Sequence, residues 1–413
     1  MKRSEIRLRS FENNPDFDFL PHQDRWLLQK SPASVKVAII GLGTIGLEHL
    51  RVAALEERAE VVAIYDSNPE IASYALDYCL TRLSIQPTLV KSLELLVQDA
   101  SIDGFFICTP NFTHLDIFKI VMASNKPIYL EKPMAHTLEQ AIALYRLAKT
   151  YGAPVHIGLQ YRFKPQYVQA LKAIAGGTLG KAHQIQMVEH RPPFLDKVQQ
   201  WNKYAQFSGG TLIEKCCHYF NLMHLIAKAR PVRVSCFAQQ ATNFLNFNTP
   251  AQSDIVDSAQ VTIEFDNKII GSLSLCMFSP SFYEELIICG DKARIKTTEE
   301  FNPILSEPTQ CSLEILQHED EVSSKSIPAY GAAIAQTGHY GSTYKAHEHF
   351  IDAILNIAPG TQTRTVPGLD PASIEESLWS IIIGHAAQVA AQQNLIVDIE
   401  QLLIQHDICE LFQ

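Results

Sequence analysis

The sequence predicts an α/β domain with a parallel sheet, followed by an α+β domain with a mainly antiparallel sheet. Strands alternate with helices from Val35 to Leu159, which is typical of βαβ units and therefore of parallel strands. From Pro231 to Thr297 the strands follow one another without helices between them, so we expect antiparallel pairing there. The 413 residues are enough for two domains.

The elements of the first domain follow from apolar runs and helix-start signals. Pro69, Ser92 and Thr137 stand where helices are expected to begin. The expected strands are 35–40, 61–65, 104–108, 128–130 and 155–159, and the expected helices follow residues 44, 69, 92, 113 and 137.

The second domain is expected to begin with a helix at 165–175 and a strand at 183–190. Further strands are expected at 232–237, 255–265, 269–277, 283–289 and 293–297, and helices at 344–357 and 374–392. The stretch from Glu299 to Gly341 has scattered Pro, Ser, Thr and Gly residues, and we expect it to be loop-like.

A glycine-rich turn, GLGTIG at residues 41–46, lies between the first strand and the first helix. In such a turn Gly41 permits the tight bend, Gly43 lets the backbone approach a pyrophosphate, and Gly46 allows close packing of helix on strand. Thr44 and Ile45 stand at the helix N-terminus, whose N–H groups and dipole attract phosphate. The sequence therefore predicts a Rossmann dinucleotide-binding domain.

Asp66 closes the second strand, twenty positions after Gly46. A carboxylate there can accept hydrogen bonds from both hydroxyls of an adenosine ribose. Asp66 is followed by Ser67, with no Arg nearby, so the 2′-phosphate of NADP would meet a carboxylate. We predict NAD as the cofactor, with NADP less favoured; the alternative is a glycine-rich loop with a surface Asp.

Composition excludes some classes of function. The formal net charge of −10 argues against nucleic acid as a partner. No run of 18 apolar residues suggests a membrane span, and residues 1–34 lack the apolar core of a signal peptide. Nine cysteines without regular spacing indicate reduced thiols and a cytoplasmic protein. Residues 1–34 are expected to be an extension that packs on a domain or a neighbouring subunit.

Four motifs occur in order along the chain: GLGTIG, CTPNFTH at 108–114, EKPMA at 131–135 and GGTLIEKCCHYFNL at 209–222. Together they closely resemble the Gfo/Idh/MocA family of NAD(P)-dependent sugar and polyol oxidoreductases. The resemblance implies a Rossmann domain at 35–159 and, at 160–413, a second domain with an open-faced sheet. Because that sheet often makes oligomer contacts in the family, we expect a homo-oligomer.

Lys132 follows a parallel strand and precedes Pro133. A lysine beside a bound nicotinamide and away from water can have a lowered pKa and exchange a proton with a substrate hydroxyl. The resemblance implies that Lys132 is the catalytic lysine, that it also contacts substrate and cofactor, and that Glu131 steadies the cofactor side. The alternative is a surface Glu–Lys pair.

Read as one helix, residues 209–228 place Glu214 one turn before His218. We expect Glu214 to hold the His218 ring, and the resemblance implies that both face the substrate as catalytic residues. The family usually has Asp in place of Glu214, so Glu214 either binds a substrate hydroxyl or only orients His218. A helix-stabilising pair is the alternative.

A metal site is not predicted. Cys216 and Cys217 are adjacent to His218, but neighbouring side chains on a helix point about 100° apart and cannot converge on zinc.

The resemblance also assigns the remaining candidates. One loop would lie over the nicotinamide ribose, although Asn111 and Thr113 could instead cap a helix. Gln160 would border the cofactor, and Tyr161 or Arg162 the substrate. Trp201, with Lys203 nearby, could cover a sugar ring or simply pack in its loop. The cofactor loop comprises Cys108, Thr109, Pro110, Asn111 and His114.

The expected reaction is reversible hydride transfer between NAD and a carbinol carbon of a sugar, sugar derivative or cyclitol, with Lys132 and His218 handling the hydroxyl proton. Three alternatives remain open at this point: a glycoside hydrolase with an internal NAD redox cycle, a non-enzymatic NAD-binding regulator, and a carbonyl reductase for a non-sugar substrate.

Overall fold

The computed structural model describes residues 34–56, 58–193, 196–243, 253–301, 309–317, 323–356 and 369–412. The extension predicted at residues 1–34 lies outside these ranges except for Ser34.

The first domain is built on a six-stranded sheet in the order β3-β2-β1-β4-β5-β6. All the strand pairs in it are parallel, and the order is that of a Rossmann fold, which confirms the prediction. The strands are β1 (Val35–Ile40), β2 (Ala59–Tyr65), β3 (Thr88–Leu89), β4 (Gly104–Ile107), β5 (Ile128–Leu130) and β6 (Val155–Ile157).

The helices of this domain begin where the sequence predicts. Asn68 caps α2 by accepting hydrogen bonds from Glu70 N and Ile71 N, and Pro69 is its first residue. Ser92 and Thr137 cap α3 and α5 in the same way. The helices are α1 (Thr44–Leu55), α2 (Pro69–Tyr78), α3 (Leu93–Gln98), α4 (His114–Val121) and α5 (Leu138–Thr150).

The second sheet has nine strands in the order β14-β13-β12-β11-β7-β10-β9-β8-β15. Only the central pair β7 and β10 is parallel, so the sheet is mainly antiparallel, as predicted. Its strands are β7 (Ala182–His190), β8 (Pro231–Gln239), β9 (Ser258–Phe265), β10 (Ile270–Cys276), β11 (Phe282–Gly290), β12 (Ala293–Phe301), β13 (Gln310–Gln317), β14 (Ser324–Ser326) and β15 (Val397–Asp398).

One face of this second sheet is covered and the other is open. In β9 the side chains alternate between buried and more exposed positions, which is the pattern of a strand with one solvent face. The buried face packs on helices, while outward residues such as Phe237 and Ile270 are exposed. The main helices of this domain are α6 (Pro165–Ala175), α9 (Cys217–Ala227) and α12 (Ile374–Gln393).

The stretch 299–341 is not the loop that we expected. It contains the end of β12, all of β13 and β14, and the short helix α10 (Ala332–Ala335). β13 pairs antiparallel with β12 and has only one buried residue, Leu313. With so few buried positions, β13 lacks the apolar run on which the strand predictions depended.

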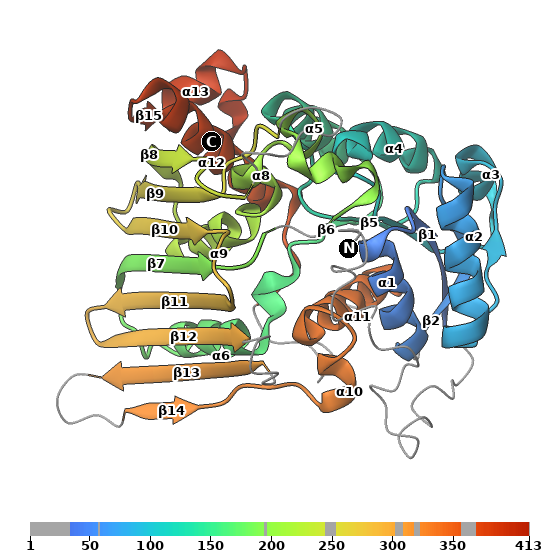
Figure 1. The fold of residues 1–413 in the computed structure, drawn as a ribbon, viewed down its shortest axis with the longest axis horizontal. Helices are drawn as coiled ribbons and strands as arrows, with labels where there is room; N and C mark the ends of the chain where they lie inside the picture. The colour runs from blue at the N-terminus through green and yellow to red at the C-terminus, as the bar shows by residue number, and fades with distance from the viewer. Residues whose placement is uncertain are drawn as a thin grey trace.

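Helix α11 (Ser342–Ile354) returns from the second half of the chain to the first sheet. Its Phe350 ring lies 4.9 Å from that of Phe106 on β4, and Asp352 forms an ion pair with Arg58. Figure 1 shows α11 between the two sheets, beside α1. The helix thereby fixes the second domain against the helix that carries the glycine-rich turn at its start.

A buried ionic cluster fixes the start of the second domain to its sheet. Lys164 Nζ lies 2.9 Å from Glu284 Oε1 on β11 and 2.9 Å from Glu299 Oε2 on β12. Tyr167 and Tyr219 donate hydrogen bonds to Glu284. Because all these groups are buried, each charge depends on its partners for solvation.

The pKa values of the two carboxyls move in opposite directions. Burial favours the neutral acid, but the charges of Lys164 and Lys215 hold the pKa of Glu284 below its ordinary value. For Glu299, burial together with the charge of Glu284 raises the pKa despite Lys164. Lys164 and its neighbours therefore stabilise the charge of Glu284 more than that of Glu299.

Replacing Lys164 with Met should lower the free energy of unfolding by about 3–5 kcal/mol, because it leaves buried Glu284 without its cation. Denaturant unfolding measures this change. The exposed Lys172 on the same helix is the control, and Lys172→Met should change stability by less than about 0.5 kcal/mol. Equal effects of the two substitutions would contradict this role for Lys164.

Candidate active site

The glycine-rich turn forms a cradle that is closed on one side and open on the other. Gly41 has φ +88°, and a Cβ there would lie 2.7 Å from the backbone at Cys108 and Thr109. A Cβ at Gly46 would lie 2.0 Å from the Gly41 carbonyl oxygen, whereas one at Gly43 would meet nothing within 4 Å. The backbone is therefore accessible at Gly43, where a pyrophosphate has to approach.

Helix α1 starts at this open point without a side-chain cap. The first backbone N–H groups of α1, which include those of Thr44 and Ile45, have no hydrogen-bond acceptor within the helix. Uncapped N–H groups and the positive end of the helix dipole suit an anion. These residues fit the dinucleotide that the sequence predicts.

Asp66 lies at the edge of the same cradle. Its carboxylate accepts hydrogen bonds from the backbone N–H groups of Leu42 and Asn68, both at 2.8 Å. The first of these bonds ties the end of β2 to the glycine-rich turn. These two hydrogen bonds hold the Asp66 carboxylate where a ribose is expected. Ser67 follows with an exposed side chain.

The loop after β4 is tied to its surroundings by two polar side chains. The ring nitrogens of His114 lie 2.9 Å from the carbonyl oxygens of Pro133 and Thr109. Asn111 Nδ2 donates to the carbonyl oxygen of Ser208 in the second domain. Asn111 therefore joins the domains instead of capping a helix, and His114 connects this loop to the EKP loop.

Glu131 belongs to a buried chain that the sequence did not reveal. One carboxylate oxygen accepts from Lys132 N, and the other lies 3.0 Å from His49 Nε2. His49 Nδ1 is 2.7 Å from His347 Nε2. The chain thus runs from the EKP loop through α1 to α11, with no local sequence signal linking its three members.

Lys132 reaches from the first domain to the second. Its Nζ donates to the carbonyl oxygen of Glu214 at 2.9 Å and lies 3.4 Å from Glu214 Oε1. Burial disfavours the ammonium, but the charges of Glu214 and Glu131 raise the pKa above its ordinary value. The expectation of a lowered pKa is therefore wrong, because it did not include a carboxylate from another domain.

Residues 209–228 do not form one helix. The segment breaks after Glu214, between α8 (Thr211–Glu214) and α9. The Glu214 carboxylate lies near Lys132 and, at 3.9 Å, Lys197 Nζ. Burial favours its neutral form, but these lysines lower the pKa of Glu214.

The expectation that Glu214 holds His218 is wrong for the same reason. His218 instead stacks on Tyr161, with ring centroids 3.8 Å apart and planes 11° from parallel. Its Nδ1 has no hydrogen-bond partner among the described residues. Burial and the charges of Lys132 and Lys215 hold the pKa of His218 well below its ordinary value, so the imidazole is neutral.

The other candidates divide into two groups. Tyr161 belongs to the site, because it carries the His218 ring and its hydroxyl accepts from Lys215 Nζ at 2.8 Å. Arg162 is buried and donates to Asn221, Glu376 and the carbonyl of Asp370. Its guanidinium thus anchors α9 and α12, which leaves it no evident role toward a substrate. Gln160 is buried, and its Oε1 has no partner among the described residues.

Trp201 lies against the first domain. Its ring is 6.4 Å from that of Phe112, at 72°. Phe112 is part of the loop after β4 and also packs on Phe207. Lys203 pairs with Asp196. These contacts fit both interpretations of Trp201, as a cover for a sugar ring and as an aromatic packed within its loop.

The sequence did not single out four charged neighbours of this site: Lys197, Lys215, Glu189 and Arg191. Lys215 Nζ lies 3.0 Å from Glu189 Oε1, and Arg191 lies 3.4 Å from the same oxygen. None belongs to a conspicuous motif, although Glu189 and Arg191 mark the end of β7, the strand at the centre of the second sheet.

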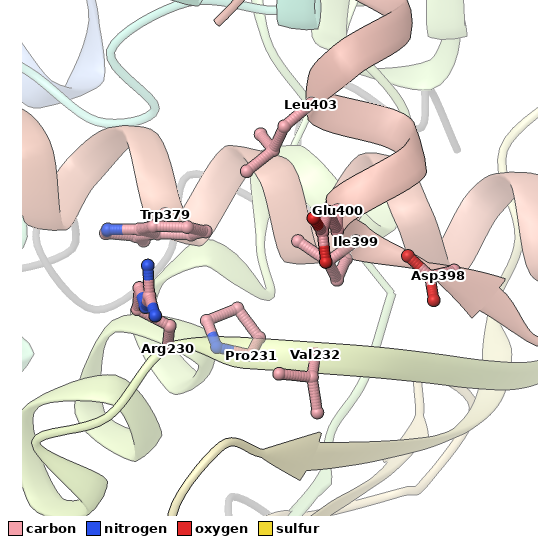
Figure 2. A pocket seen from close by; sticks show the side chains of 8 residues that line it. All are labelled: Arg230, Pro231, Val232, Trp379, Asp398, Ile399, Glu400 and Leu403. Atoms are coloured by element: carbon pink, nitrogen blue, oxygen red, sulfur yellow. The ribbon is translucent and has the colours of Figure 1, made fainter. Parts of the chain in front are cut away.

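A separate cavity of about 110 Å³ lies at the far edge of the second sheet. Figure 2 shows Trp379 over Arg230 and Pro231, with Asp398 and Glu400 beside them. No predicted site residue lines it, so it is not the site described above.

The described residues contain no group of three or more His, Cys, Asp or Glu side chains that could hold a metal ion. All nine cysteines are free, and Cys216 and Cys217 are buried. None of the helices within the described ranges is long and apolar enough to cross a membrane.

Stability should depend on pH through His218. Because its folded pKa is lowered, the imidazole binds a proton more readily in the unfolded chain, and this costs stability as the pH falls below about 6.5. His218→Gln should therefore lose less free energy of unfolding between pH 7 and pH 5 than the wild type does. The exposed His183→Gln control should follow the wild-type curve. Parallel curves for all three proteins would contradict a buried neutral His218.

Comparisons with known proteins identify the family of the chain. The family model described as "Oxidoreductase family, NAD-binding Rossmann fold" matches residues 35–159, and "Oxidoreductase family, C-terminal alpha/beta domain" matches residues 171–398. Inositol 2-dehydrogenase of Rhizobium meliloti is 26% identical over 50% of this chain and 58% of its own length. Myo-inositol 2-dehydrogenase of Thermotoga maritima is 22% identical over 89% of this chain and 100% of its own.

A solved structure shares the fold. Levoglucosan dehydrogenase in complex with NADH and levoglucosan aligns with a TM-score of 0.70 and 18% identity, covering 88% of this chain and 99% of that one. Together with the two family models, which cover most of the sequence, these matches show that the chain belongs to the Gfo/Idh/MocA oxidoreductase family and carries its NAD-binding Rossmann domain.

Proposed function

We propose that the protein is an NAD-dependent dehydrogenase that transfers a hydride between nicotinamide and a hydroxyl-bearing carbon of a sugar, sugar derivative or cyclitol. The observation that carries the proposal is the contact of Lys132 from the NAD-binding domain with Glu214 of the second domain, four residues before His218. NAD bound in the cradle supplies the hydride acceptor or donor.

The protein's own groups handle the proton. Lys132, held charged by Glu214, donates a hydrogen bond to the substrate oxygen and can supply a proton when a carbonyl is reduced. His218 is neutral and stacks on Tyr161, so its role in the proposal is that of a partner to Lys132 that accepts a hydrogen bond from the substrate hydroxyl. Glu214 acts on Lys132 instead of on His218.

The substrate class rests on resemblance and on the relatives' names, which include inositol and levoglucosan dehydrogenases. Asp66, anchored beside the glycine-rich turn, favours NAD over NADP. We also propose that the open face of the second sheet, where Phe237 is 79% exposed, joins copies of this chain; the mass in solution, compared with 46.2 kDa for one chain, tests this. A cytoplasmic location stays a prediction from composition.

Lys132→Met should lower kcat/KM by about 10²–10⁴-fold, the usual contribution of a proton-transfer group, while NAD affinity stays close to that of the wild type. Absorbance of the reduced cofactor measures turnover, with NAD and NADP each tested against sugars and cyclitols. Lys126→Met is the matched control, because Lys126 lies before β5 in the same domain and its Nζ donates to the carbonyl oxygen of Asp99.

Each alternative has its own result in this experiment. Sugar release without net NADH would identify a glycoside hydrolase with an internal redox cycle. NAD binding without any turnover that depends on Lys132 would indicate a regulator. Turnover restricted to non-sugar carbonyl compounds would indicate a carbonyl reductase. Unchanged turnover in Lys132→Met would overturn the role given to this lysine.

A further inference from the structure

Lys197 is a second lysine at the active site. It lies between β7 and the 3-10 segment Val198–Lys203, and its Nζ is 3.9 Å from Glu214 Oε1. The same oxygen is 3.4 Å from Lys132 Nζ. Both nitrogens are within 4 Å of one carboxylate oxygen, which places them within reach of a single sugar-sized molecule.

This arrangement leaves positive charge in excess. The side chains of Lys132 and Lys197 are only 14% and 23% exposed, so water compensates their charges poorly. They share one carboxylate. Glu131 also attracts both ammonium groups and raises their pKa values, but its carboxylate pairs with His49 at 3.0 Å. Glu189 is occupied by Lys215 at 3.0 Å and by Arg191 at 3.4 Å. An ammonium group that is held in a largely buried site without a full counter-charge is stabilised by any anion that enters.

The pKa of Lys197 agrees with this imbalance. Burial and the charges of Lys132 and Arg191 lower the pKa, and the attraction of Glu214 does not fully offset them. Lys132, which is closer to Glu214, has its pKa raised. Glu214 thus stabilises the charge of Lys132 more than that of Lys197, and a further negative charge beside Lys197 would raise its pKa.

Lys197 also lies on the side of the site that faces the cofactor domain. Its Nζ is 4.8 Å from the centre of the Trp201 ring, and Trp201 contacts Phe112 in the loop after β4. The lysine stem is therefore held between the ring and Glu214. A group bound at Lys197 would lie beside a hydroxyl presented to Lys132, because both Nζ atoms lie within 4 Å of Glu214 Oε1.

We propose that Lys197 is a specificity-determining residue that binds an acidic substituent, a carboxylate or a phosphate, on the substrate whose hydroxyl faces Lys132. The inference rests on the proposed function for the position of that hydroxyl. A neutral sugar would leave two ammonium groups on one carboxylate, whereas an anionic sugar would give each ammonium its own counter-charge. Lys suits either anion because it acts as a compact point charge.

The test uses matched pairs of compounds that differ in one acidic group. D-Glucuronate and D-glucose form the carboxylate pair, and myo-inositol 1-phosphate and myo-inositol form the phosphate pair. Calorimetry on the NADH-loaded protein measures the Kd of each compound, and cofactor absorbance measures turnover separately. In at least one pair the acidic member should bind roughly 10- to 100-fold more tightly, the range of a charged hydrogen bond.

Two variants test whether the preference for the acidic compound depends on the charge of Lys197. Lys197→Met keeps a stem of similar length against Trp201 but removes the ammonium, and it should bring the acidic member to the affinity of the neutral one. The effect should appear in Kd and KM more than in kcat. Lys197→Arg keeps the charge and should retain most of the preference, which a loss of packing alone would not predict.

The two measurements separate the two proposals. Tighter binding of the acidic compounds, abolished in Lys197→Met, would support the subsite even if no compound is turned over. In that case only the proposed dehydrogenase function would fail. Equal binding of acidic and neutral members in both pairs, absence of binding by all four compounds, or a preference unchanged in Lys197→Met would overturn the subsite, whatever the turnover.

Discussion

The contact between Lys132 and Glu214 connects the two halves of the active site. Lys132 follows a strand of the NAD-binding domain, and Glu214 ends a short helix of the second domain, 82 residues later. The lysine donates to the backbone carbonyl as well as facing the carboxylate, so both the position and the charge of the ammonium depend on the second domain. The Lys164 cluster and α11 matter to function because they hold that domain in place.

The electrostatics of the site distinguish the two groups proposed to handle the substrate proton. Carboxylates keep Lys132 charged, whereas burial and the nearby ammonium groups keep His218 neutral. A charged hydrogen-bond donor and a neutral acceptor therefore coexist at one pH, which fits the proposed oxidation of a hydroxyl. Glu214 sets this division through Lys132, and its extra methylene relative to the Asp usual in the family gives it reach toward a second lysine, Lys197.

Much of the fold was predictable because its signals are local. The GLGTIG turn, the caps of α2, α3 and α5, and the succession of strands in the second sheet each follow from neighbouring residues. The partner of Glu214 was not predictable, because an i,i+4 pattern assumes an unbroken helix, whereas the helix ends at Glu214. The sign of the Lys132 pKa shift, the Glu131–His49–His347 chain and the role of Lys197 depend on contacts between distant segments. β13 was missed because almost all its side chains are partly exposed.

A crystal structure of the protein with NADH would test the central claim most directly, through the position of nicotinamide C4 relative to Lys132 Nζ and the His218 ring. The account predicts that C4 faces both groups across a space one substrate carbon wide, so that a carbinol carbon in that space lies about 3–3.5 Å from C4 while its oxygen reaches Lys132. A nicotinamide directed away from Lys132, or one separated from it by the Glu214 side chain, would contradict the account.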